Sequence, residues 1–285
     1  MAVGIRIENT AGPRGKQAVA LKISADRSAI YDSAITGHQD TLSVDRGNFM
    51  AVGIRVENTA GPRGKQAVAL KISADRSAVY DSAITGYQDT LSVDRGKFMA
   101  VGIRIENTAG PRGKQAVALK ISADRSAIYD SAITGYQDTL CVDAGRQYYS
   151  SCYISGFTDF IFGDAAALID RSTVEMRLGK STAVITASGR ETNTPTGIVI
   201  RGCNVTAGEG VKEGSFGRPW KNCSRVVMIG NYLPKPMEAL CMGGGDDRQL
   251  PACGECISLE SCLAWPMFWY VDGDVPAFAI PVHMP

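Results

Sequence analysis

The 285-residue chain contains 30 Lys and Arg residues against 29 Asp and Glu residues, so its formal net charge is +1. It is 45% hydrophobic and 21% charged, which is ordinary for a globular protein. Because no basic tract runs along the chain, nucleic acid is excluded as a partner. The apolar stretch 263–271 is too short for a membrane span and contains Pro266.

Residues 1–147 consist of one 49-residue unit repeated three times. A repeat of this kind predicts units that stack, since each unit is too small to bury its own apolar face. Interchangeable units also favour misassembly, so we expect aggregation or swapped oligomers through the repeats. The first two copies differ at these positions only: Ile7/Val56, Ile30/Val79, His38/Tyr87 and Asn48/Lys97.

Within each unit the pattern is that of short strands separated by turns. In the third copy Val117, Leu119 and Ile121 alternate with Ala118 and Lys120, which predicts a strand with one buried face. Gly and Pro residues in 107–113 predict a loop.

The glutamines of the unit recur at unequal intervals, which indicates two coils per copy. Gln88 and Gln115 are 27 residues apart, and Gln115 and Gln137 are 22 apart, so one of the two coils has a longer loop. Short parallel strands joined by crossovers predict an all-β fold, a right-handed single-stranded parallel β-helix.

The third copy continues into a sequence that the first two lack. Gln115, Gln137 and Asp159 lie at equal intervals of 22 residues, with Asp138 beside Gln137, and are predicted to share one face of the coil. Two neighbouring carboxylates suit acyl transfer, because one attacks while the other, with a raised pKa, supplies and recovers a proton. Nearby amide groups are suitable donors to an oxyanion.

Four ordered motifs occupy residues 115–119, 135–140, 159–163 and 217–220. Together they resemble the motifs of the plant pectin methylesterases, or pectinesterases. The resemblance implies a pectinesterase-like β-helix that hydrolyses the methyl esters of pectin (homogalacturonan) and releases methanol, with no cofactor and no metal.

The resemblance divides the chain into three parts. Residues 99–232 form the pectinesterase-like portion, 1–98 are two extra tandem copies of the unit, and 233–285 are a divergent tail. Because the family's opening coils and closing coils have no counterpart here, we expect a β-helix that is incomplete at both ends. The family is directed to the extracellular cell wall, although no secretory signal is visible at Met1.

Carried over by motif, the resemblance implies a role for each candidate site residue. Asp159 is the nucleophile, and Asp138 is the general acid and then the general base. Gln115 and Gln137 are the oxyanion donors, and Arg218 holds Asp159 through its fork of donors. The aromatic residues implied to line the substrate groove are Trp220, Tyr136 and Phe160.

Each assignment has a structural alternative. Asp138 and Asp159 also suit turns, Arg218 suits an extended surface segment, Tyr136 and Phe160 suit the core, and Gln115 suits an internal amide ladder. At the chain level, the alternatives are a catalytically inactive β-helix that binds pectin and a purely structural repeat protein.

The first two copies are predicted to lack a nucleophile. Asp138 and Asp159 are 21 residues apart, and the same step from Asp40 and Asp89 reaches Gly61 and Gly110. We therefore expect one site, in the third copy.

The cysteines leave two questions open. In the tail, one Cys-x-x-Cys pair among Cys241, Cys253, Cys256 and Cys262 suits zinc, but accidental cysteines are the favoured interpretation. The other four, which a secreted setting would allow to form disulfides in a pairing that the sequence leaves undetermined, are Cys141, Cys152, Cys203 and Cys223.

Overall fold

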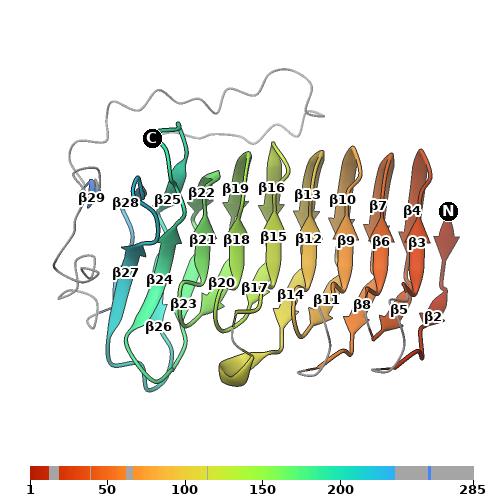
Figure 1. Cartoon of the computed structure of the whole chain (residues 1–285), viewed down its shortest axis with the longest axis horizontal. Helices are drawn as coiled ribbons and strands as arrows, with labels where there is room; N and C mark the ends of the chain where they lie inside the picture. Colours follow the sequence, from red (N-terminus) through yellow and green to blue (C-terminus); the bar gives the residue numbers. More distant parts are fainter. Residues whose placement is uncertain (13–18, 39, 62–66, 114, 235–255, 258–285) are drawn as a thin grey trace.

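The computed structural model describes residues 1–12, 19–38, 40–61, 67–113, 115–234 and 256–257, and in them the chain winds into a solenoid of parallel strands (Figure 1). From β1 to β28 successive strands belong to three different sheets in turn, and each strand from β1 to β25 pairs with the strand three places further along the chain. The only helix among the described residues is a single 3-10 turn, η1 (Gly110–Arg112). The predicted all-β parallel β-helix is therefore confirmed.

The first sheet contains eleven strands. They are β1 (Ala2–Val3), β4 (Arg27–Tyr31), β7 (Asn48–Val52), β10 (Arg76–Tyr80), β13 (Lys97–Val101), β16 (Ser126–Tyr129), β19 (Arg146–Ser150), β22 (Ala166–Asp170), β25 (Gly197–Arg201), β28 (Val226–Ile229) and β29 (Cys256–Ile257).

The second and third sheets contain nine strands each. Those of the second are β2 (Arg6–Glu8), β5 (Ala34–Gly37), β8 (Arg55–Asn58), β11 (Ala83–Gly86), β14 (Arg104–Asn107), β17 (Ala132–Thr134), β20 (Tyr153–Gly156), β23 (Thr173–Met176) and β26 (Asn204–Ala207). Those of the third are β3 (Leu21–Ile23), β6 (Leu42–Val44), β9 (Leu70–Ile72), β12 (Leu91–Val93), β15 (Leu119–Ile121), β18 (Leu140–Val142), β21 (Ile161–Gly163), β24 (Ala183–Ser188) and β27 (Gly214–Pro219).

Each 49-residue copy forms two coils of unequal length, as the glutamine spacing predicted. In the first sheet Asn48 pairs with Arg76 and Arg76 pairs with Lys97, which are steps of 28 and 21 residues (76 − 48 and 97 − 76). These steps replace the 27 and 22 read from the glutamines. The difference arises because Gln115 is one residue out of register: extending the pairing of Leu119 with Leu140 puts Ala116, not Gln115, level with Gln137.

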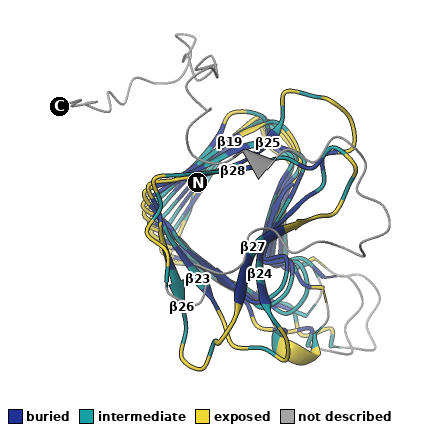
Figure 2. Cartoon of the chain, turned by 90° about the vertical axis from the view of Figure 1, so that its left-hand side faces the viewer, coloured by how far each residue is buried: buried dark blue, intermediate teal, exposed yellow. Residues whose placement is uncertain are grey.

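The interior is a continuous stack of apolar side chains. Figure 2 shows the coils that enclose it, with each residue coloured by its burial. In the third sheet Leu119 and Ile121 are fully buried while Lys120 points outward, so the predicted alternation holds within β15. It fails just before the strand, because Ala118 is buried and Val117 is half-exposed. Identical or similar residues stack from coil to coil, which is how units too small to fold alone obtain a shared core.

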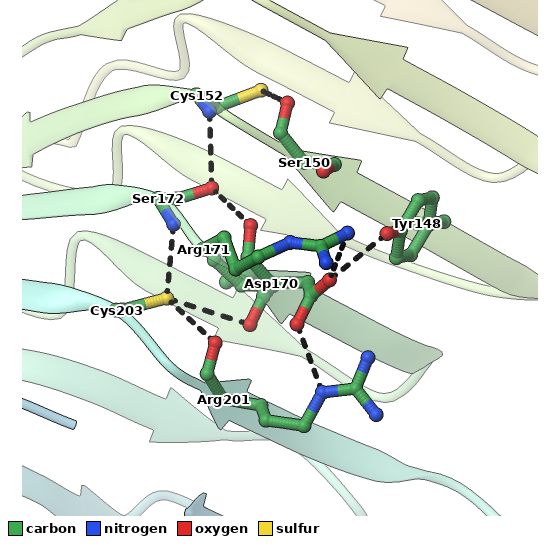
Figure 3. Close-up of polar contacts among 9 residues, drawn as sticks. Tyr148, Ser150, Cys152, Asp170, Arg171, Ser172, Arg201 and Cys203 are labelled. Atoms are coloured by element: carbon green, nitrogen blue, oxygen red, sulfur yellow. Dashed lines mark hydrogen bonds and ion pairs between the residues drawn. The ribbon is translucent and has the colours of Figure 1, made fainter. Parts of the chain in front are cut away.

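Outside the repeats, polar contacts connect the coils around Asp170 (Figure 3). The Asp170 side chain is only 3% exposed and forms ion pairs with Arg201 and Arg171, while the Tyr148 hydroxyl donates a hydrogen bond to it. The Arg201 hydrogen bond holds the pKa of Asp170 below its usual value although burial opposes this. Deleting this carboxylate would leave the Arg201 guanidinium and the Tyr148 hydroxyl without their shared partner.

Cys141, Cys152 and Cys203 are buried free thiols. Cys152 and Cys203 lie in one column beside Ser172, and the Ser172 N–H donates to the Cys203 sulfur. The two cysteines are therefore two rungs apart, about 9.6 Å at the usual strand spacing, which is beyond disulfide reach. Of the four tail cysteines only Cys256 lies in the described residues, so the possible zinc site lies almost wholly outside them. Within the described ranges, no helix has the length and apolar character needed to cross a bilayer.

Candidate active site

The two candidate carboxylates come from the same position of two successive coils on the third sheet. Asp138 and Asp159 each stand two residues before a strand, and the pairing of Leu140 with Ile161 puts them on adjacent rungs. The Asp138 N–H donates to the carbonyl of Thr158 at 3.1 Å, which continues the ladder to this level. Adjacent rungs are about 4.8 Å apart, so the two side chains are direct neighbours.

Both aspartates adopt a left-handed backbone conformation, with φ of 59° at Asp138 and 49° at Asp159. Among residues other than Gly, Asp is one of the few that tolerate this conformation. Both residues are therefore turn residues, as the structural alternative predicted. Asp138 and Asp159 are each 8% exposed, so both residues are largely shielded from water.

Arg218 contacts one of the two aspartates in a bidentate manner. Its Nε donates to Asp159 Oδ1 at 2.9 Å, and its second nitrogen donates to Asp159 Oδ2. The predicted link between Arg218 and Asp159 is therefore present, across the 59 residues that separate them. The arginine comes from β27, two rungs beyond β21. Its guanidinium orients the Asp159 carboxylate and stabilises its charge.

Asp138 lies in a different electrostatic environment. Burial, followed by the negative charge of Asp159, raises the pKa of Asp138 to about 6, and Arg218 only partly opposes this. Two equivalent residues thus differ in environment, because the arginine bonds to one carboxylate and not to the other. Asp138 therefore keeps its proton up to about pH 6, next to a carboxylate that an arginine holds.

The two glutamines lie at the same edge of the third sheet. Gln137 forms a bridge with Thr158 and is half-buried, and its carbonyl accepts a hydrogen bond from the N–H of Ala116 at 3.3 Å. Gln115, the residue before Ala116, is exposed. The two amide side chains therefore come from the same edge as the carboxylate pair.

Two aromatic side chains, Phe162 and Trp220, pack against each other, the first close to Asp159 in the sequence and the second just after the strand of Arg218. Trp220 is 56% exposed, and its ring meets Phe162 edge to face with centroids 6.1 Å apart. Gly189 makes room for it, since a Cβ there would lie 2.9 Å from the Trp220 ring. Sequence reasoning missed Phe162, although strand alternation in 161–163 would have found it, because Ile161 points inward and the next side chain must point outward.

Phe160 does not line this groove, and that prediction is wrong. It is fully buried, in the column that continues Thr41, Thr90 and Thr139 of the preceding coils. The left-handed turn at Asp159 directs the next side chain into the core. Tyr136 is half-exposed and packs on Phe157, with ring centroids 5.1 Å apart.

Asp40 and Asp89, the equivalent aspartates of the first two copies, have no carboxylate on the adjacent rung among the described residues. The residues found on that rung are not the predicted ones. The N–H of Val68 donates to Asp40 Oδ1 at 3.0 Å, and Val117 stands beside Asp89. Gly61 and Gly110 were predicted for these positions. They lie elsewhere because the coil that follows Asp40 and Asp89 is the longer, 28-residue coil.

The fold and the site together define a class: a parallel β-helix protein whose surface presents two stacked carboxylates, one of them held by arginine, beside exposed aromatic rings. Within that class, the sequence model described as Pectinesterase matches residues 1–47, 41–97 and 90–241. The chain belongs to the pectinesterase family.

Individual relatives agree with this assignment. The chain is 40% identical over 237 residues to the probable pectinesterase/pectinesterase inhibitor 23 of Arabidopsis thaliana, a match that covers 80% of this chain and 24% of that protein. The chain therefore spans about a quarter of that relative's length.

Two solved structures have a fold similar to that of this chain. The pectin methylesterase from Aspergillus niger is 30% identical with a TM-score of 0.56, over 75% of this chain and 70% of that one. The pectin methylesterase from carrot is 27% identical with a TM-score of 0.51, over 73% of this chain and 64% of that one.

Proposed function

We propose that this chain hydrolyses the methyl esters of pectin, the methylated homogalacturonan, to free carboxylates and methanol. The observation that carries the proposal is the asymmetric carboxylate pair: Arg218 bonds Asp159, while burial and the Asp159 charge raise the pKa of Asp138. Membership of the pectinesterase family supports the same chemistry.

In the first half of the reaction Asp159 acts as the nucleophile. Its carboxylate attacks the ester carbonyl carbon, and the negative charge that develops on the carbonyl oxygen is stabilised by the amide N–H groups of Gln115 and Gln137. The bond from the carbonyl carbon to the methoxy oxygen then breaks. Asp138 gives its proton to that oxygen, so methanol leaves and the acyl group stays on Asp159.

In the second half water replaces methanol. Asp138, now a carboxylate, removes a proton from water as the water oxygen attacks the acyl carbon. The bond to Asp159 breaks, which releases the uronic acid and restores both aspartates. Arg218 holds the leaving carboxylate in place through its two hydrogen bonds.

The exposed aromatic rings serve substrate binding. Sugar rings present flat C–H faces that pack on aromatic side chains, and the exposed Trp220 and the half-exposed Phe162 and Tyr136 support this role. We propose a secreted protein that works in the cell wall. The triplets Asn204-Val205-Thr206 and Asn222-Cys223-Ser224 match the acceptor pattern for N-glycosylation, and both asparagines are exposed, as glycosylation in a secretory route requires.

The test measures methanol release from highly methylated pectin. Asp159→Asn removes the nucleophile and is expected to lower the rate at least about a thousandfold, as losses of nucleophiles commonly do. Asp89→Asn is the matched control, because this aspartate occupies the equivalent turn of the second copy but has Val117 beside it instead of a carboxylate.

Three outcomes contradict the proposal. The first is a folded wild-type chain that releases no methanol, and the second is an Asp159→Asn variant with full activity. The third is an equal loss in Asp89→Asn and Asp159→Asn. Retention on immobilised pectin without methanol release would instead support the inactive pectin-binding alternative.

A further inference from the structure

Arg190 is a buried arginine at the end of a strand of the third sheet. It follows Gly189 directly after β24 and is only 2% exposed. β24 lies between β21 and β27 (Figure 1), the strands of Phe162 and Arg218. Across the described ranges, no ion pair involves Arg190. A buried cation without a carboxylate partner is costly, so its hydrogen bonds must compensate for the lost hydration.

The guanidinium of Arg190 donates to two separate segments. Its Nε donates to the carbonyl of Thr194 at 2.9 Å, and its Nη2 donates to the same carbonyl at 2.6 Å and to Asn193 Oδ1 at 2.5 Å. Its Nη1 donates to the carbonyl of Cys223 at 2.8 Å. The backbone carbonyl of Arg190 in turn accepts a hydrogen bond from the N–H of Cys223 at 3.1 Å. Arginine suits this arrangement because its planar fork directs several donors at once, which the single ammonium of lysine cannot do.

Further hydrogen bonds attach the segment 220–225 to the end of β24. The Ser224 hydroxyl donates to the carbonyl of Ser188 at 2.8 Å, and the N–H of Arg225 donates to the Ser188 hydroxyl at 3.1 Å. Together with the bonds of Arg190 to residue 223, three consecutive residues of the segment are bonded to residues 188–190. The segment is therefore fixed relative to β24.

Trp220 is the exposed ring whose position depends on this attachment. It follows directly after the last residue of β27, so it lies outside the strand ladder. Its ring packs over Gly189, where a Cβ would lie 2.9 Å away, and against Phe162, with ring centroids 6.1 Å apart. Arg218, in contrast, belongs to β27 and is positioned by the pairing of that strand with β24. Loss of the Arg190 bonds should therefore release Trp220 and leave Arg218 in place.

We propose that Arg190 is a positioning residue for substrate binding. Its fork fixes the segment 220–225, so that Trp220 presents its ring to a sugar of the substrate. The identity of that substrate rests on the proposed function, whereas the placement of the ring does not. An apolar side chain could fill the same space without burying a charge, so the buried guanidinium favours a geometric role. Because Trp220 is placed for binding the sugar, Arg190 should act on KM and not on kcat.

The first experiment replaces Arg190 with lysine, which keeps the charge and loses the fork. Arg190→Lys should raise the KM for methylated pectin about tenfold and leave kcat within about twofold of the wild type. Trp220→Ala should raise KM by a similar factor. The double variant Arg190→Lys/Trp220→Ala should have the same KM as Trp220→Ala alone, because both changes remove the same contact with the substrate.

Fluorescence anisotropy of Trp220 tests the positioning without catalysis. The chain has three tryptophans, so Trp265→Phe/Trp269→Phe leaves Trp220 as the single one. In this background Arg190→Lys should lower the anisotropy, because the ring gains fast motion. Arg201→Lys is the matched control, since this arginine lies on β25 of the first sheet and its replacement should change neither the anisotropy nor KM. Thermal unfolding checks that every variant is folded.

Asn193→Ala serves in place of Arg190→Lys if the lysine variant does not fold. It keeps Arg190 and removes one acceptor of the guanidinium. The anisotropy should again fall and KM should again rise, by about twofold, because the other acceptors remain. Unchanged values in that case would contradict the proposal.

Four results with folded variants overturn the proposal. One is an unchanged anisotropy of Trp220 in Arg190→Lys, and another is a lower anisotropy with an unchanged KM. The third is a loss confined to kcat, which would indicate a disturbed reaction centre. The fourth is a double variant in which the two increases in KM multiply, because the residues would then act independently. A wild-type chain that releases no methanol overturns the proposed function instead, and the anisotropy then decides on the positioning alone.

Discussion

The carboxyl group of Asp138 is expected to make the protein less stable as the pH rises, and Asp138→Asn should abolish this dependence. The folded state raises the pKa of Asp138 from an ordinary 3.8 to about 6, mainly through burial and then through the charge of Asp159. A carboxyl group with a raised pKa binds its proton more tightly in the folded state. Stability is therefore complete below about pH 4 and is lost as the pH rises through about 6.

The size of the effect follows from the shift. About two pKa units at 1.36 kcal/mol each correspond to a loss of about 2 to 3 kcal/mol between pH 4 and pH 7. The residue is 8% exposed, so solvent screening reduces this figure little. Asparagine has nearly the same shape and carries no charge at either pH, so the variant should become more stable than the wild type as the pH rises.

The assay is urea unfolding followed by circular dichroism, for both proteins at pH 4 and pH 7. The informative quantity is the change with pH in the difference between their free energies of unfolding, since this cancels all other titrating groups. Asp159→Asn should reduce the step without abolishing it, because burial remains after the neighbouring charge is removed.

Asp124 provides a control of opposite sign. Its hydrogen bond and ion pair with Arg146 lower its pKa to about 2, so its contribution to stability is present above the ordinary value and is lost only below about pH 4. Asp124→Asn should therefore leave the change between pH 4 and pH 7 as it is in the wild type. If Asp138→Asn and the wild type lose stability equally over this interval, the inference that folding raises the pKa of Asp138 is wrong.

Three further outcomes follow from the geometry. Arg218→Lys should lower the rate of methanol release by about a hundredfold while folding is retained, because lysine cannot form both bonds to Asp159, and an unchanged rate would show that the fork is dispensable. Phe160→Ala should lower the free energy of unfolding by about 3 to 5 kcal/mol, whereas Phe162→Ala should mainly raise KM; the reverse pattern would contradict the assignment of core and groove. Asp170→Asn should destabilise the protein measurably in thermal unfolding, because Arg201 and Tyr148 lose a shared charged partner, and an unchanged melting temperature would argue against a structural role.

Repetition and strand alternation were sufficient to predict the fold. Every coil repeats the same short strands, so a strand such as 119–121 is specified by its own pattern and again by the equivalent strands above and below it. The link between Arg218 and Asp159 came instead from the resemblance of motifs, because local pattern contains no information about a contact over 59 residues.

The predictions that failed lie in the turns. Sequence alternation cannot give the side to which Phe160 points, because the left-handed conformation of Asp159 shifts the alternation just before the strand starts. Likewise, residue counting gave Gly110 as the neighbour of Asp89, whereas the longer coil brings Val117 there. In both cases loop conformation, which is set by tertiary packing, decides the outcome.

The same difference between short and long coils explains why tripling the unit extends the scaffold without multiplying the paired carboxylates. After Asp40 and Asp89 the chain takes the 28-residue step and returns with a valine, whereas after Asp138 it takes the 21-residue step and returns with Asp159. A copy added between the first and second would therefore add two rungs and one more lone aspartate. Copy number should therefore change the length of the solenoid while the number of paired-carboxylate sites per chain stays at one.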